Sequence, residues 1–419
     1  MKISVLTLGC KTNQAESFHL ERLLNGSGHE IVDLSGKPDL CVINTCTVTA
    51  KADYQSRQLI QRALKNNAKV IVTGCYAELN RERLHDLGSA VRVVRNDDKE
   101  KIFNLIQKQG SSDSGNLSHY PRHRPIVKVQ DGCNYSCSYC AIPQARGRSR
   151  SIPVGKIVEE ISFYASLGFN EVVLTGIHLG TYGADLSPRG SLSFLVKEIL
   201  RGTAIRRVRL SSLEIREIDD ELLEMLQEER LCHHLHIPLQ SGSGKILKLM
   251  NRMYSSEEFS RGIERIAKRL PTIALGTDVI VGFPGEGTEE FEATHKLIES
   301  LPFTYLHVFP YSLRPGTRAA SFPLQVDEAV KKERVVVLRD LGAEKRAAYL
   351  KRNIGEKLWT VIEKVEEEGA TGTTGNYIKV SLRGSCSWRE GMLVLTHITG
   401  IDGDRAVGVP ENNPELFHL

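Results

Sequence analysis

Short apolar runs alternate with longer segments of helical periodicity over the first hundred residues of the chain. The predicted strands are Lys2–Leu8, Asp39–Thr45, Lys69–Gly74 and Val91–Arg95, and the predicted helices include Ala15–Leu24, residues 52–66 and Lys99–Lys108. Strand and helix in strict alternation predict a parallel, doubly wound sheet.

A polar stretch rich in Gly, Ser and Pro, residues 111–125, interrupts this pattern and is typical of a domain linker. Beyond it the alternation resumes with longer helical units, among them Lys156–Leu167, Asp219–Gln227 and Glu289–Leu301. The predicted strands are residues 126–131, 171–176, 207–211, 234–239, 273–281 and 305–311. Six such units predict a partial (β/α)6 barrel, whose functional groups collect at the carboxyl ends of the strands.

After a charged helix near Asp327–Leu350, the pattern changes to short alternating strands. These are Leu358–Lys364, Tyr377–Leu382, Met392–Ile398 and Ala406–Val409, separated by turns at Gly369, Gly372, Gly375, Gly384 and Gly391. Such a pattern predicts a small β-barrel. We therefore expect an α/β protein with an N-terminal doubly wound parallel sheet (residues 1–110), a linker (111–125), a partial barrel (126–350) and a C-terminal small β-barrel (351–419).

The composition of the 419 residues is that of an ordinary globular protein, with 41% hydrophobic and 25% charged residues. No apolar run approaches the roughly 20 residues of a membrane span, and no signal peptide is predicted. Nine cysteines without such a signal indicate the reducing cytoplasm and metal chemistry. The sequence thus predicts a cytoplasmic protein without a membrane partner, and nothing in it requires an oligomer, so we expect a monomer.

Three cysteines, Cys10, Cys46 and Cys75, each lie at the carboxyl end of a predicted strand of the first domain. The carboxyl ends of parallel strands share one edge of a sheet, where such folds bind ligands, so these thiols should converge on a metal cluster. The alternative is three separate buried thiols, because free cysteine is often a small core residue. We interpret Cys41, Cys232 and Cys386 as structural thiols of that kind.

A second set, Cys133, Cys137 and Cys140, directly follows the strand at residues 126–131 in a C-x3-C-x2-C pattern. Soft thiolates suit iron–sulfur clusters, and three ligands leave one iron of a [4Fe–4S] cube open, as catalytic metal sites require. Zinc sites favour paired C-x2-C units or added histidines, and disulfides favour short secreted chains. The spacing resembles that of the radical S-adenosylmethionine enzymes, in which the open iron chelates the methionine moiety of the cofactor.

The net charge of +4 is modest, but basic residues gather around this triplet. Between residues 122 and 156 the sequence contains seven Lys or Arg and one acid, Asp131. The basic residues are Arg122, Arg124, Lys128, Arg146, Arg148, Arg150 and Lys156. A phosphate-rich substrate near the reactive centre explains this stretch, and a solvated charged loop is the alternative.

The two cysteine sets and the terminal barrel together resemble one family, the radical methylthiotransferases. The resemblance covers essentially the whole chain and is carried by Thr7–Ser17, Ile43–Thr49, Val72–Cys75, Gly132–Ser151, His236–Ser243, Thr277–Glu286 and Gly372–Val380, the last of which resembles a TRAM domain.

The resemblance implies two [4Fe–4S] clusters, a radical-generating one on Cys133, Cys137 and Cys140 and an auxiliary one on Cys10, Cys46 and Cys75. One S-adenosyl-L-methionine would donate a methyl group to a sulfur, and a second would yield the radical that activates an unreactive carbon. It also implies a one-electron donor such as flavodoxin or ferredoxin, and a tRNA anticodon stem-loop as substrate.

The stretches Leu8–Gln14 and Asn44–Asp53 are most similar to the branch that acts on N6-threonylcarbamoyladenosine at position 37 of tRNA. The alternatives are N6-isopentenyladenosine in tRNA, an aspartate of a ribosomal protein, and a non-catalytic iron–sulfur protein that binds RNA or acts as a sensor. The threonylcarbamoyl group carries a carboxylate, so its pocket should supply a cation, whereas isopentenyl needs an apolar pocket.

Further residues at or near predicted strand ends are hypotheses for contacts with S-adenosylmethionine, with structural polar roles as the alternative: Tyr139, Thr175, Ser212, Gln240 and Asp278. Asn376 and Tyr377 are candidates for contact with RNA by stacking, although Tyr377 equally suits the packing of the small barrel. No catalytic side chain is identified from the sequence.

Overall fold

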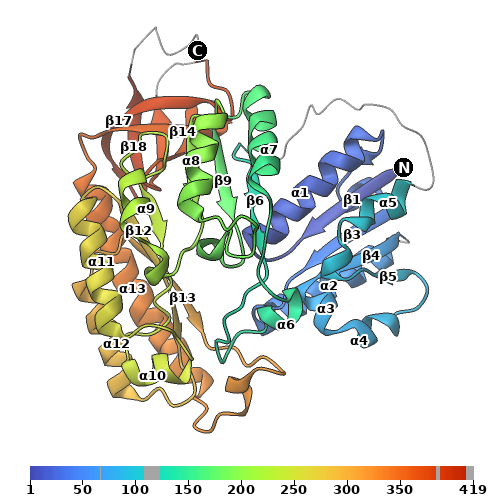
Figure 1. Ribbon diagram of the computed structural model, residues 1–419, viewed down its shortest axis with the longest axis horizontal. Helices are drawn as coiled ribbons and strands as arrows, with labels where there is room; N and C mark the ends of the chain where they lie inside the picture. The colour runs from blue at the N-terminus through green and yellow to red at the C-terminus, as the bar shows by residue number, and fades with distance from the viewer. Residues whose placement is uncertain (67, 108–122, 384–386, 412–419) are drawn as a thin grey trace. The chain divides into compact units, whose positions relative to one another are not determined.

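The computed structural model describes residues 1–66, 68–107, 123–383 and 387–411, which form two compact units (Figure 1). The first unit contains the described residues before 108 together with Gln130–Arg150 and Ser312–Ser321. The second contains residues 123–129, Ser151–Tyr311 and the described residues from Phe322 onward. The segment with the cysteine triplet packs with the N-terminal unit, and the small barrel packs with the partial barrel. Most of the expected linker, and Cys386, lie outside the described residues.

A five-stranded parallel sheet forms the centre of the first unit, with strand order β2-β1-β3-β4-β5. The strands are β1 (Lys2–Thr7), β2 (Glu30–Ile31), β3 (Leu40–Thr45), β4 (Lys69–Gly74) and β5 (Val91–Val93). The helices are α1 (Lys11–Gly26), α2 (Ala50–Lys65), α3 (Cys75–Leu79), α4 (Arg81–His85) and α5 (Lys101–Gln107). The predicted doubly wound sheet is confirmed. Its strand order reverses between β1 and β3, which is where such sheets open a ligand crevice.

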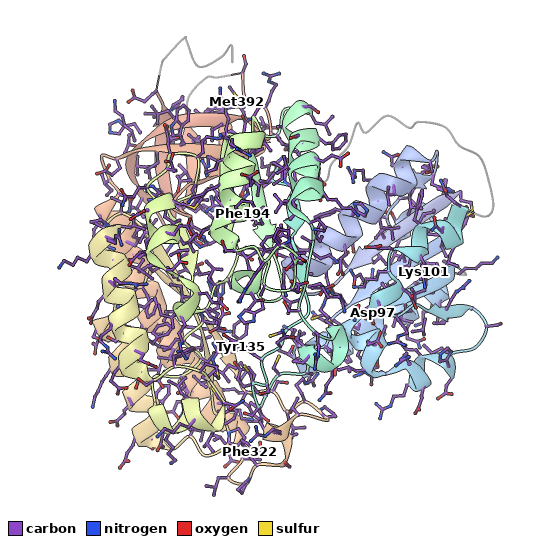
Figure 2. The ribbon with its side chains drawn as sticks, in the orientation of Figure 1. Asp97, Lys101, Tyr135, Phe194, Phe322 and Met392 are labelled. Carbon is purple, nitrogen blue, oxygen red and sulfur yellow. The ribbon has the colours of Figure 1, made fainter. Side chains whose placement is uncertain are left out.

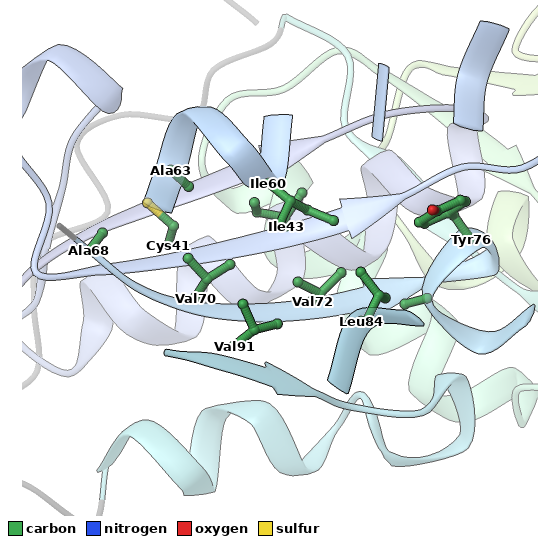
Figure 3. Close-up of a cluster of buried hydrophobic side chains, with 11 residues drawn as sticks. Cys41, Ile43, Ile60, Ala63, Ala68, Val70, Val72, Tyr76, Leu84 and Val91 are labelled. Carbon is green, nitrogen blue, oxygen red and sulfur yellow. The ribbon is translucent and has the colours of Figure 1, made fainter. Parts of the chain in front are cut away.

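Each face of this sheet has its own apolar core. Leu40, Val42 and Ile71 pack with Leu24 of α1 and Ile102 of α5 on one face. The alternate residues of the same strands, among them Cys41, Ile43 and Val70, pack on the other face with α2, as Figure 3 shows. Cys41 is fully buried there, in keeping with its interpretation as a structural thiol. It lies near the amino end of β3, whereas Cys46 follows the carboxyl end.

Six parallel strands of the second unit form two three-stranded sheets, in the orders β10-β9-β6 and β11-β12-β13. They are β6 (Ile126–Lys128), β9 (Glu171–Thr175), β10 (Arg207–Leu210), β11 (His234–His236), β12 (Ala274–Val281) and β13 (Tyr305–Pro310). The helices between and after them are α7 (Val154–Ser166), α8 (Leu192–Gly202), α9 (Asp220–Met225), α10 (Gly244–Leu249), α11 (Ser256–Arg269), α12 (Thr288–Ser300) and α13 (Glu328–Arg352). The predicted six-strand partial barrel is thus present. Among the described residues, no helix combines the length and apolar character needed to cross a membrane.

The chain ends in a closed five-stranded barrel of order β14-β15-β16-β18-β17. Its strands are β14 (Lys357–Glu366), β15 (Gly369–Thr374), β16 (Lys379–Arg383), β17 (Leu393–Asp402) and β18 (Arg405–Pro410). The sequence prediction was wrong for β15, which it assigned to glycine-rich turns. A Cβ atom on Gly372 would lie 2.4 Å from the carbonyl oxygen of Val361 on β14, so glycine lets the strands approach closely.

A buried carboxylate joins the partial barrel to the small barrel within the second unit. Glu171 on β9 is fully buried and accepts a 2.8 Å hydrogen bond from Arg209 Nε, and its Oε2 lies 2.5 Å from Arg207 Nη2. The same two arginines also bind the small barrel. Arg209 donates hydrogen bonds to the carbonyl oxygens of Thr374 and Gly375. Arg207 donates one to the carbonyl oxygen of Trp359. Burial alone would raise the pKa of Glu171, but the positive charges of Arg207, Arg209 and Arg124 lower it to about 2.

Replacing this carboxylate should destabilise the protein. We expect Glu171→Gln to lower the free energy of unfolding by about 3–5 kcal/mol, because it leaves buried guanidinium charges uncompensated. The pKa of Glu171 in the fold lies below its ordinary value of 4.5, so its contribution is complete above that pH and is lost as the pH falls toward 2. Urea denaturation of the parent protein and of Glu171→Gln, at pH values from 7 down to 3, measures the difference between their free energies of unfolding. This difference should become smaller as the pH falls.

The matched control is Glu221→Gln, which removes an exposed ion pair with Lys197. This variant should lower the free energy of unfolding by less than about 1 kcal/mol at every pH. Equal costs for the two variants would contradict the joining role of Glu171.

Candidate functional site

Cys10, Cys46 and Cys75 lie at the carboxyl ends of three neighbouring strands of the first unit. Cys10 is the residue before α1 and follows β1 closely, Cys46 directly follows β3, and Cys75 begins α3 directly after β4. Because β3 pairs with both β1 and β4, the three residues share one sheet edge beside the strand-order reversal. Cys46 and Cys75 are buried and Cys10 is exposed.

The three thiols are close enough to influence one another. A Cβ atom on Gly9, the residue before Cys10, would lie 2.8 Å from Cys46 Sγ. Burial raises the pKa of Cys46 to about 11, and the neighbouring Cys75 and Cys10 contribute to the increase. Gly74 has φ of +98°, and a Cβ atom there would lie 2.3 Å from the Thr45 carbonyl oxygen, so this glycine lets β4 turn tightly into Cys75.

Asn13 on α1 ties the strand ends together. Its side-chain amide donates to the carbonyl oxygens of Leu8, at 2.7 Å, and Thr45, at 3.0 Å. These bonds hold the chain just before Cys10 beside the chain just before Cys46. The three cysteines therefore follow neighbouring strand ends, and soft thiolates are the ligands that iron–sulfur clusters prefer.

The triplet Cys133, Cys137 and Cys140 lies in a loop of the same unit, between β7 (Gln130–Asp131) and α6 (Ile142–Arg146), and all three residues are partly exposed. The loop is held by hydrogen bonds from the Cys133 N–H to the Gly147 carbonyl and from the Cys140 N–H to the Cys137 carbonyl, both 3.1 Å. The Tyr135 N–H, in a residue labelled in Figure 2, lies 3.4 Å from Cys133 Sγ. Accessible thiols and a backbone N–H directed at one of them suit a cluster that must receive a small-molecule ligand.

Helix α6, which follows the triplet, packs against α3, which begins with Cys75. At the end of α6 the Arg146 side chain is fully buried, and its Nε donates to Cys75 Sγ at 3.3 Å. Its Nη1 donates to Glu16 Oε1 and to Asp131 Oδ1, each at 2.8 Å. Burial raises the pKa of Cys75, while the positive charges of Arg146 and Lys99 oppose that increase.

The basic residues around the triplet have different surroundings within their own units. Arg146 is buried in the contacts above, and Arg124 pairs with Glu171 and Glu363 in the second unit. Arg150 lies within ion-pair distance of Asp97 and Asp131, and Arg148 is exposed. Arg122 lies outside the described residues. The prediction that the stretch meets a phosphate-rich substrate is therefore wrong for Arg146, because its charge is neutralised internally.

The residues predicted to contact S-adenosylmethionine are placed as follows. Thr175 is the buried last residue of β9, and Ser212 is exposed just beyond β10. Gln240, with φ of +65°, pairs with β12 through its backbone. Tyr139 is half-buried in the triplet loop and belongs to the first unit, whereas the other four belong to the second. Asp278 lies inside β12, which ends at Val281.

Asp278 belongs to a chain of polar and aromatic side chains that the sequence analysis did not identify. Its Oδ1 lies 2.9 Å from His236 Nε2 and 3.1 Å from His307 Nδ1. The Oη of Tyr305 in turn lies 3.0 Å from His236 Nδ1 and 2.8 Å from His234 Nε2. Burial would raise the pKa of Asp278, but hydrogen bonds from His236 and His307 lower it well below its usual range.

These side chains share one face of β11, β12 and β13. Asp278 pairs in register with His307, and Gly276 pairs with both His236 and Tyr305. Leu306, on the opposite face of β13, contacts Gly342 of α13, so the His307 face is the interior one. The signal in the sequence was the two-residue spacing of His234 with His236 and of Tyr305 with His307.

Tyr377 extends this series into the small barrel. Its ring stacks on His234 with centroids 4.4 Å apart, and Asn376 is buried with hydrogen bonds to Thr374 and Asn353. These contacts favour the packing alternative for Tyr377, and contact of the two residues with RNA stays a prediction.

Comparison with protein families finds two matches. Residues 127–298 match the radical SAM superfamily, and residues 2–110 match the family described as uncharacterized protein family UPF0004. A threonylcarbamoyladenosine tRNA methylthiotransferase, MtaB, of Aquifex aeolicus is 38% identical over 404 residues, covering 92% of this chain and 97% of that protein.

The chain belongs to the radical S-adenosylmethionine methylthiotransferase family. The MtaB of Bacillus subtilis is also 38% identical, covering 90% of each chain. The tRNA-2-methylthio-N(6)-dimethylallyladenosine synthase of Thermodesulfovibrio yellowstonii is 31% identical, covering 96% of this chain and 98% of that protein. The resemblance inferred from the sequence motifs is confirmed, and this methylthiotransferase is a sulfur-transferring enzyme.

Solved structures agree on the fold. The radical S-adenosylmethionine methyltransferase TsrM of Kitasatospora setae superimposes with a TM-score of 0.57 at 16% identity, covering 76% of this chain and 77% of that one. The cobalamin-dependent S-adenosylmethionine radical enzyme OxsB gives a TM-score of 0.51 at 13% identity, covering 83% of this chain and 56% of that one. As a radical SAM protein, this methylthiotransferase uses S-adenosylmethionine and a [4Fe–4S] cluster.

Proposed function

We propose that this methylthiotransferase converts N6-threonylcarbamoyladenosine at position 37 of tRNA into its 2-methylthio derivative, using two [4Fe–4S] clusters. MtaB relatives are 35–38% identical to this chain, whereas the dimethylallyladenosine synthase of Thermodesulfovibrio yellowstonii is 31% identical. This difference favours the threonylcarbamoyl substrate over N6-isopentenyladenosine. The tRNA anticodon stem-loop is then the substrate, a flavodoxin or ferredoxin supplies electrons, and the reaction takes place in the cytoplasm.

The observation that carries the two-cluster proposal is the convergence of Cys10, Cys46 and Cys75 at one sheet edge. Three thiols from three separate strands, with Asn13 bridging two strand ends, form a ligand set that ordinary core packing does not require. Cys41 shows the contrast, because it packs among apolar side chains on one face of the same sheet. Cys133, Cys137 and Cys140 then hold the cluster common to radical SAM proteins.

The bound clusters and S-adenosylmethionine supply the radical and the methylthio group, and the protein positions them and the substrate. The Cys133 loop presents partly exposed thiols, so that cluster stays accessible to its ligand. Cys46 and Cys75 are buried, which limits access of water to the second cluster. Tyr139, Thr175, Ser212, Gln240 and Asp278 remain our assignments for contacts with S-adenosylmethionine.

The interior face of β11–β13 supports a polar substrate substituent. His307 projects from β13 with half of its side chain exposed, and the Asp278 carboxylate accepts from its Nδ1. An imidazole oriented by a carboxylate can carry the positive charge that a threonylcarbamoyl carboxylate requires, whereas an isopentenyl group gains nothing from it.

The second cluster can be tested by counting iron. We expect Cys46→Ser and Cys75→Ser, after anaerobic reconstitution, to retain about half of the iron of the parent protein, because one of two equal clusters is lost. Cys41→Ser, a thiol in the apolar core, should retain all of it. Full iron content in Cys46→Ser and Cys75→Ser would refute the assignment.

The substrate can be tested by mass spectrometry of nucleosides from tRNA of a strain that lacks the gene. The expected result is loss of 2-methylthio-N6-threonylcarbamoyladenosine, accumulation of its unthiolated precursor, and restoration by the intact gene but not by Cys137→Ala. An unchanged level of this nucleoside, with loss of the isopentenyl derivative, would contradict the proposal.

The role of His307 can be tested by His307→Phe, with His295→Phe on α12 as the matched control. We expect the first variant to lower kcat/KM for the threonylcarbamoyl substrate at least about tenfold, the effect of losing one charge-assisted hydrogen bond. Cleavage of S-adenosylmethionine without substrate should not change. An equal loss in the two variants would show that His307 does not recognise the substrate.

A further inference from the structure

Arg146 follows one cysteine set in the sequence and contacts a member of the other. It is the last residue of α6, the short helix that follows Cys140, and its guanidinium reaches the sulfur of Cys75 on a different part of the chain. Nothing in the pattern of the sequence distinguishes it from Arg148 and Arg150, yet Arg146 has a fully buried side chain and the other two are exposed.

Its hydrogen bonds cover all three guanidinium nitrogens. Nε donates to Cys75 Sγ, Nη1 donates to Glu16 and Asp131, and Nη2 donates to the Asn13 side-chain oxygen and, at 3.3 Å, to Glu16 Oε2. Asn13 is the residue that bridges the ends of β1 and β3, so Arg146 also contacts the element that places Cys10 and Cys46. The guanidinium orientation is therefore set by its other partners, which direct Nε to the sulfur.

The two acidic and two basic side chains of this group balance one another before any charge on Cys75 is counted. Glu16 and Asp131 are matched by Arg146 and Lys99, whose Nζ lies 2.5 Å from Glu16 Oε2. A negative charge on Cys75 then adds to a neutral group of side chains, and the N–H of Arg146 is the donor that faces it. Hydrogen bonds to cluster sulfurs raise the reduction potential, and partners of metal ligands also fix ligand orientation.

We propose that Arg146 is a positioning residue for the auxiliary cluster, holding Cys75 in its ligating orientation and raising the reduction potential of that cluster by its Nε hydrogen bond. This inference rests on the two-cluster proposal. Because Arg146 follows the triplet loop directly, the same contact ties the segment that binds the radical-generating cluster to a ligand of the auxiliary one.

The test uses the full-length protein with Cys133, Cys137 and Cys140 replaced by alanine, so that the remaining iron reports on the auxiliary cluster alone. Its reduction potential is measured by titration with detection by electron paramagnetic resonance. Arg146→Gln, which removes the charge, should shift the potential to more negative values, and Arg146→Lys, which keeps the charge but loses the planar fork, should shift it less. Arg148→Gln is the matched control and should leave it unchanged.

Each outcome has a separate meaning. A folded Arg146→Gln variant that loses iron while Arg146→Lys retains it supports the positioning role, and far-ultraviolet circular dichroism verifies the fold. If Arg146→Gln fails to fold, the reduction potential of Arg146→Lys is the test: a shift to more negative values supports the inference, and an unchanged value overturns it. An unchanged potential with full iron content overturns the inference but leaves the auxiliary cluster intact. A parent protein without any iron overturns the two-cluster proposal itself.

Discussion

Two fully buried arginines organise this molecule, one in each unit. Arg146 and Arg209 are the largest side chains among its fully buried described residues. Taking a guanidinium out of water is costly unless carboxylates and carbonyl oxygens surround it, so each arginine determines the positions of several segments at once. Arg146 holds Glu16 and Asp131 together through ion pairs with both. Arg209 pairs with Glu171 at the junction with the small barrel.

The functional geometry follows from this constraint in the first unit. A parallel sheet brings three strand ends to one edge, but it does not orient the thiols that follow them. Arg146 contacts the sulfur of Cys75, and Asn13 bonds the chain on either side of the strand-order reversal, before Cys10 and Cys46. In the second unit, the equivalent ion cluster fixes the small barrel on the partial barrel. The small barrel also contacts the interior face of β11–β13, because Tyr377 stacks on His234.

Much of this arrangement could be predicted from the sequence, because apolar periodicity determines which strands form and a parallel sheet determines where their ends lie. The edge that carries Cys10, Cys46 and Cys75 follows from those two facts. Strand β15 could not be predicted, since its glycines are required by the close approach of neighbouring backbones and not by turns. Nor could the burial of Arg146 or the chain from His234 to His307, because both depend on partners distant in sequence.

The sheet of the first unit ends in very short strands, with two residues in β2 and three in β5. The small barrel of the second unit is closed and has no edge strand. Edge strands expose backbone groups that pair with other chains, and short or closed edges suppress that association. A protein that must receive its iron and sulfide after synthesis passes through a period with exposed thiols. The edges of the first unit's sheet and the closed small barrel give intermolecular sheet formation little opportunity during that period.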